Sequence, residues 1–200
     1  SGDVRLTSNQ GAGLLTGAAT DINMWGGIIS LAGSTRHNNN ITFYNDARIS
    51  NDNVAGAAFN NLTVAPRTGS TAPVVVWAQN VSGGNFTTAY GGLTLNGDAQ
   101  FSVVHGFQVN GAISGTGNLE KYMNERLYIG GDSSGYSGTL TAYAGSFMSL
   151  NASSTAKPFG TGAITINPGS TIRVAAPSNV NVGQLTLNSD LGGISSVGMS

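Results

Sequence analysis

The chain has no cysteine among its 200 residues. This absence excludes thiol catalysis, disulfide frameworks and zinc sites built on cysteine. A secreted protein without disulfides must obtain its stability in another way, and continuous stacking of strands is one physical means of doing so.

Charge is also scarce. Charged residues make up 8% of the chain, against roughly 25% in average soluble domains. The net charge is −1 and the eight Lys and Arg residues are scattered, so no basic stripe exists and no nucleic-acid binding is expected. No apolar run reaches the roughly 18 residues of a membrane helix, so no membrane insertion by this segment is expected. No signal-peptide pattern follows Ser1, which fits a mature fragment as well as a cytosolic protein.

Glycine and uncharged polar residues take the place of charge. The chain has 30 glycines, and 40% of its residues are hydrophobic, enough to form the core of one domain over residues 1–200. The apolar residues alternate with polar ones in short clusters such as LTL, ITI and TIRV, which is the period of a half-buried strand.

Such strand-like clusters recur at short, fairly even intervals, a spacing typical of a sandwich, a barrel or a solenoid. Three features favour the solenoid: strands shorter than usual, Gly-rich steps such as NGD (96–98) and NGA (110–112) that can act as corners, and a loosely repeated Gly-Thr-Gly phrase. The clusters lie at residues 4–7, 28–31, 41–44, 62–64, 74–77, 93–95, 101–104, 127–129, 139–141, 147–150, 163–166, 171–174 and 184–187.

A β-solenoid predicts which residues face inward. Coils of about 20–25 residues give about eight to ten coils, and a rod about 40–50 Å long follows from the distance between stacked strands. In the strand SFMSL (146–150) the phase is ambiguous, because Phe147 and the pair Met148 and Leu150 cannot all face the core. The predicted inward residues are Leu93, Leu95, Phe101, Val103, Leu127, Ile129, Ile164, Ile166, Ile172, Val174, Leu185 and Leu187.

Two segments are irregular. Residues 117–129 have a weak helical pattern, but the turn signals around them predict two short strands joined at Asn124-Glu125. The segment PRTGSTAP (66–73) is rich in proline and glycine and predicts a loop that leaves the coil, within a possible excursion over residues 65–92. Such a loop is either a plain connection or a binding element on a rigid scaffold.

Residues 113–174 carry a family resemblance. ISGTGNLEK, SGYSGTL, AGSFMSLNASS and FGTGAITINPGSTIRV together resemble the passenger-associated strand repeat of bacterial autotransporters. The match is close over this segment, whereas the chain before it matches only in style. The sequence departs from the family at KYMNERLYIGG, where charged Glu125 and Arg126 replace expected glycines and put the corner geometry in question.

The resemblance implies a right-handed parallel β-helix exported through the outer membrane to the bacterial cell surface. It also implies that the segment is part of a longer secreted chain, covalently linked to a C-terminal translocator barrel. Both ends stop within the repeating pattern, as in a fragment. Parallel β-helices include polysaccharide lyases and hydrolases, so the fold alone does not decide the function.

Catalysis requires titratable groups that converge. Asp98, Glu120 and Asp132 could gather on one face for glycoside hydrolysis, which uses two carboxylates, but Asp98 and Asp132 follow glycine in turn-like steps and read better as solvated turn residues. For lyase chemistry the acids Asp46 and Asp52 and the bases Lys121 and Lys157 form a poor signal, and no calcium-binding nonapeptide occurs.

Other chemistry finds no support either. His37 and His105 lack a partner at metal-ligand spacing, and no GxSxG elbow occurs. We therefore expect no enzyme activity, and no catalytic, cofactor-binding or metal-binding residue.

The abundant Asn and Thr residues suggest hydrogen-bonded ladders along the coils, which either hydrate the surface or support self-association. The expected function is that of a non-catalytic structural or adhesive segment of a secreted surface protein, with self-association or a cell-surface ligand as its interaction. The alternatives are a fibre subunit that stacks end to end and a carbohydrate-active β-helix enzyme.

Overall fold

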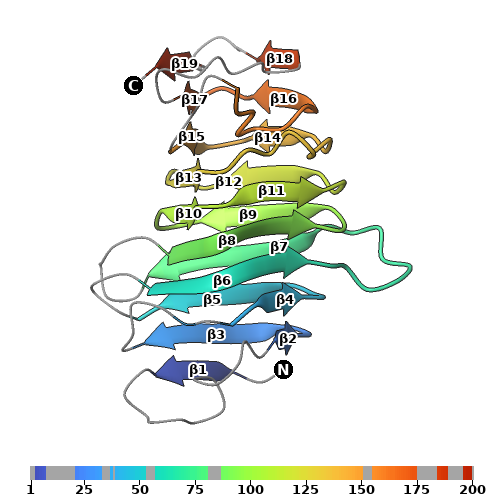
Figure 1. The fold of residues 1–200 in the computed structure, drawn as a ribbon, viewed down its shortest axis with the longest axis vertical. Coiled ribbons are helices and arrows are strands. Elements are labelled where there is room, and N and C mark those ends of the chain that lie inside the picture. The colour runs from blue at the N-terminus through green and yellow to red at the C-terminus, as the bar shows by residue number, and fades with distance from the viewer. Residues whose placement is uncertain are drawn as a thin grey trace.

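The structure is a computed structural model that describes residues 3–7, 21–32, 37, 39–52, 57–80, 87–150, 155–174, 184–188 and 196–199. Within these ranges every element is a strand, and every strand pair is parallel. The strands form two sheets whose ladders run along the long axis of the molecule (Figure 1). The predicted parallel β-helix, a β-solenoid, is confirmed.

The chain alternates between the two sheets as it proceeds along the long axis of the molecule. In order along the axis, the first sheet contains β1 (Val4–Thr7), β3 (Gly27–Ala32), β5 (Ala47–Asn51), β7 (Val74–Asn80), β9 (Ala99–Val103), β12 (Leu119–Tyr122), β14 (Leu140–Ala142), β16 (Ala163–Ile166) and β18 (Gln184–Leu187). The second contains β2 (Ile22–Met24), β4 (Ile41–Phe43), β6 (Ala57–Val64), β8 (Thr87–Leu95), β10 (Phe107–Val109), β13 (Arg126–Ile129), β15 (Gly145–Ser149), β17 (Ser170–Val174) and β19 (Ser196–Met199), with β11 (Ala112–Gly115) beside β10 on β8.

Coil length varies with the connections. Ile29 pairs with Ile49 one coil above, whereas Ala47 pairs with Val76, so the second of these two coils is the longer one. The longer coil contains the connection 65–73, which projects from the side of the stack (Figure 1). The predicted excursion over 65–92 is therefore confined to this connection within the described residues, because β7 and residues 87–92 of β8 lie in the two sheets.

The core fills the space between the two sheets. The predicted inward residues from Leu93 to Val174 are all buried, and Leu185 packs partly against the core. Leu187 is an error in this prediction, since 46% of its side chain is exposed. It lies in β18, the last of the described strands in the order of its sheet, which has a paired strand on one side only among the described residues. Phe147 faces inward and is fully buried, while Met148 is half-buried, which resolves the phase of that strand.

The weakly helical segment 117–129 contains two strands, β12 and β13, separated by residues 123–125 as predicted. The left-handed residue at this corner is Met123, with φ 68°, rather than Glu125 or Arg126, where the resemblance placed the missing glycines. Lys121 faces inward in register with Phe101 and Ala142 and is fully buried. Its ammonium donates to the carbonyls of Met123 (2.7 Å) and Ala144 (2.8 Å). The lysine therefore stabilises the corner between β12 and β13.

Side-chain ladders add to the axial hydrogen bonding between coils. Asn40 donates to Asp21 (2.9 Å) and accepts from Asn60 (2.9 Å) and Asn61 (2.8 Å), and Asn188 donates to Asn167 (2.9 Å). The predicted asparagine ladders therefore exist at these two places. They join neighbouring coils without relying on a pair of opposite charges.

Candidate functional site

One corner of the coil carries a cleft. The chain passes from the second sheet to the first through Trp25 and Gly26 after β2, through residues 44–46 after β4, and through the connection 65–73 after β6. Because parallel coils place equivalent positions one strand spacing apart, Trp25 and Tyr44 stack, with ring centroids 4.4 Å apart and planes inclined by 15°.

Hydrogen bonds hold Tyr44 in place, whereas the Trp25 side chain is largely exposed to solvent. The amide of Tyr44 donates to the carbonyl of Met24 (2.9 Å), and its hydroxyl donates to Asn23 Oδ1 (3.3 Å). The chain turns directly after Trp25, and 64% of the Trp25 side chain is exposed. Tyr44, which lies on the next coil, therefore packs against one face of the exposed Trp25 ring, and the two rings form an aromatic surface.

The connection 65–73 is an ordered loop. The amide of Ser70 donates to the carbonyl of Arg67 (2.9 Å), and Gly69 between them has φ 85°. A positive φ at the third residue is the mark of a type II turn, which favours glycine there. The loop rejoins the coil where the amide of Val75 donates to Asp46 Oδ1 (2.8 Å).

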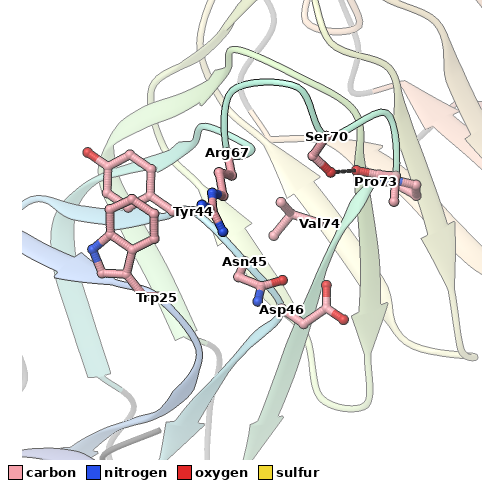
Figure 2. A pocket seen from close by; sticks show the side chains of 9 residues that line it. Trp25, Tyr44, Asn45, Asp46, Arg67, Ser70, Pro73 and Val74 are labelled. Carbon is pink, nitrogen blue, oxygen red and sulfur yellow. Dashed lines mark hydrogen bonds between the residues drawn. The ribbon is translucent and has the colours of Figure 1, made fainter.

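The loop and the aromatic pair enclose a cavity of about 380 Å³ (Figure 2). Arg67, Ser70 and Pro73 line it from the loop, Trp25 and Tyr44 line it from the stack, and Asn45, Asp46, Ala72 and Val74 complete it. A second hollow of about 240 Å³ shares Asp46 and is lined by Gly27, Ile28, Ala47, Arg48 and Trp77. The two hollows therefore adjoin at Asp46.

Asp46 is the one carboxylate that lines either hollow, and Arg67 and Arg48 are the cations. Hydrolysis of a glycoside by the usual route needs two carboxylates, and the residues that line these two hollows include one. The chemical capacity of this arrangement is that of a small pocket with an aromatic wall and a few polar groups, typical of ligand sites.

The acids considered for catalysis serve the backbone and neighbouring side chains instead. Asp98 accepts from the amide of Asn118 (2.8 Å), and Asp132 accepts from the amides of Lys157 (2.9 Å) and Ser134 (3.1 Å). The hydrogen bond from Lys157 is the main cause that lowers the pKa of Asp132. Glu120 accepts from Gln100 Nε2 (2.8 Å) and from the Tyr122 hydroxyl (3.0 Å).

Asp52 and His37 were further candidates from the sequence. Asp52 accepts from the hydroxyls of Ser30 and Ser50. His37 is buried, which lowers its pKa, and its Nε2 has no partner among the described residues.

The part of the chain that the structure describes contains no group of three His, Asp or Glu residues that could hold a metal ion. No helix with the length and hydropathy of a bilayer-spanning segment occurs in the described ranges.

No family model, curated protein or solved structure matches this chain. The cleft therefore has to be interpreted from its own residues. Sequence reasoning located the loop but missed Trp25 and Tyr44. The signal was present, because INMW (22–25) and ITFY (41–44) both place an aromatic ring directly after an alternating strand, in successive coils.

Proposed function

We propose that this chain is a non-catalytic, structural and adhesive β-helix segment of a secreted bacterial surface protein of the autotransporter-passenger type. Its place would be the cell surface, as part of a longer chain linked to a translocator barrel, and its ligand a component of another cell. The observation that carries the proposal is the corner cleft, a cavity lined by residues of the stack and of the connection 65–73, which projects from the side of the rod (Figure 1).

The use of the carboxylates supports a role without catalysis. Asp98, Asp132 and Glu120 accept fixed hydrogen bonds from neighbouring groups, and the cleft has the single carboxylate of Asp46. Functional residues on loops held by a rigid scaffold are a general feature of binding proteins. The resemblance of residues 113–174 to autotransporter repeats supports the cellular location.

An adhesion assay tests the function. The purified chain is coupled to latex beads, and the beads are incubated with cultured epithelial cells and with bacterial cells. We expect more beads to be retained than with albumin-coated beads, and no new reducing ends when the chain is incubated with cell-surface polysaccharides. Retention at the albumin level on both cell types would contradict an adhesive role, and released reducing ends would contradict a non-catalytic one.

A further inference from the structure

The cleft pairs two kinds of surface that one class of ligand needs together. A pyranose sugar has flat faces of C–H groups and a rim of hydroxyls. The C–H faces pack on aromatic rings, whose faces carry partial negative charge, whereas the hydroxyls require donors and acceptors at the edge. In the cleft the Trp25–Tyr44 stack supplies the rings, and Asn45, Asp46 and Arg67 supply the polar groups (Figure 2).

The aromatic surface is preorganised. Tyr44 supports one face of the Trp25 ring, and its own hydroxyl and amide are hydrogen-bonded to the preceding coil. A wall that is already ordered loses little entropy when a ligand binds. Trp25 nevertheless keeps 64% of its surface exposed to solvent, so a ligand can still cover it.

The polar groups retain bonding capacity. Asp46 Oδ1 accepts from Val75, and an ionised carboxylate has about four acceptor positions in total. No hydrogen bond between described residues uses the Arg67 guanidinium, which offers five donors. A purely apolar ligand would bury these charges without partners, at a cost. A ligand with many hydroxyls would satisfy them.

The size fits more than one sugar unit. The main cavity, about 380 Å³, falls in the usual range for ligand pockets, roughly 300–1,000 Å³. The adjoining hollow shares Asp46 and is also lined by a second exposed ring, Trp77, and a second cation, Arg48. A chain of sugars can therefore continue from the first hollow into the second.

We propose that this corner cleft binds a pyranose residue of a glycan, with its C–H face against the Trp25–Tyr44 stack and its hydroxyls on Asp46, Asn45 and Arg67. This proposal rests on the adhesive function above and names the ligand class of that site. The glycan is bound and released unchanged, since the cleft has one carboxylate.

Tryptophan fluorescence tests the site in solution. The chain has two tryptophans, so Trp77→Phe leaves Trp25 as the sole reporter. The probes are cellotetraose, chitotetraose and tetragalacturonic acid. We expect at least one to change the Trp25 emission saturably, and Trp25→Ala to lower its affinity for the chain at least about tenfold by calorimetry. Binding of none of the three would overturn the proposal.

Matched variants separate the site from general surface effects. Tyr143→Ala is the control, because Tyr143 is also an exposed ring stacked on a tyrosine, Tyr122, but on another part of the rod. We expect it to bind like the native chain. Asp46→Asn keeps an oxygen for the Val75 amide and removes the charge, and we expect weaker binding with an unchanged melting temperature. Equal affinity of Trp25→Ala and the native chain would contradict the placement.

The choice of probe identifies the source of the sugar. If the acidic tetramer binds best, Arg67→Gln should remove that preference, which assigns a carboxylated glycan. If a neutral tetramer binds best, Arg67→Gln should weaken all probes alike, which assigns a neutral glycan. An Arg67→Gln variant that binds every probe as tightly as the native chain would contradict the contact proposed for Arg67.

The bead assay distinguishes the two proposals. Mild periodate oxidation destroys vicinal diols of cell-surface sugars, and we expect it to abolish retention of native beads; Trp25→Ala beads should not be retained on untreated cells. Native beads that still adhere to oxidised cells would overturn the glycan proposal and leave adhesion intact. Native beads that never adhere would contradict adhesion, while the titration in solution still decides whether the cleft binds sugar.

Discussion

Lys121 makes the stability of this rod depend on pH in a way that can be measured. Its side chain is fully buried, in register with Phe101 and Ala142 on the neighbouring coils. Burial lowers the pKa of Lys121 from 10.5 to about 8, although nearby Glu125 acts in the opposite direction. In the unfolded chain the lysine should titrate near its ordinary value.

The direction in which the free energy of unfolding changes with pH follows from the number of protons bound by each state. Between pH 8 and about pH 10.5 the unfolded chain carries one more proton at this site than the folded chain, so the free energy of unfolding rises with pH in that window. Below pH 8 both states are protonated and the penalty of the buried charge is fully present. From pH 7 to pH 10 the native chain should gain about 2–3 kcal/mol from this site.

A variant isolates the effect. Lys121→Met keeps a long apolar side chain and removes the titrating group. The variant also loses the hydrogen bonds to the carbonyls of Met123 and Ala144, so the test is how the difference between the two proteins changes with pH and not its size at one pH. Tyrosines such as Tyr122, whose pKa burial raises to about 12, contribute alike to both proteins and cancel in the difference.

The assay is urea unfolding of both proteins at pH 7, 8, 9 and 10, followed by circular dichroism. The native value minus the variant value should increase by about 2–3 kcal/mol across the series. A difference that stays constant, or that decreases as the pH rises, would refute the reasoning and show that the lysine reaches solvent.

Three further substitutions test the packing of the coils. Phe101→Ala removes a fully buried ring in edge contact with Phe107 and should lower the free energy of unfolding by about 3–5 kcal/mol in urea titrations; a loss below about 1 kcal/mol would contradict the burial. Gly111→Ala places a Cβ in steric overlap with the carbonyl oxygen of Gly91, so calorimetry should show a lower melting temperature, and an unchanged one would mean that these coils do not approach so closely. Tyr136→Phe keeps the ring but removes the buried hydroxyl that donates to the carbonyl of Gly117 (2.8 Å); we expect a loss of about 1–3 kcal/mol in chemical unfolding, and no loss would indicate that water replaces the hydroxyl.

The strand pattern and one of the two Gly-containing corners could be predicted from the sequence. Alternation marks one inward face per strand wherever a core exists, which is why the inward residues from Leu93 to Val174 could be assigned. The Gly-containing step at 96–98 is a corner, since it joins β8 of the second sheet to β9 of the first. The step at 110–112 is not the predicted corner, because β10 and β11 on either side of it both pair with β8 in the second sheet.

Only part of the cleft could be predicted from the sequence. The proline and glycine residues at 66–73 indicated the loop, since both residue types favour turns. The stacking of Trp25 on Tyr44 depends on the register with which β2 pairs with β4, and coil length varies too much for a single sequence to specify that register. The buried position of Lys121 was not predicted either, because alternation alone does not reveal that a charged residue occupies an inward position with carbonyls within reach.

The position of the binding corner is tested by backbone amide shifts in ¹H–¹⁵N NMR spectra, recorded while the tetrasaccharide that binds is added to the native chain. We predict that the largest changes fall on Trp25, Asn45, Asp46 and residues 67–70, with the Trp25 indole N–H among them. Changes centred on Tyr122 and Tyr143 instead, or spread evenly along the strands, would contradict a glycan site at this corner.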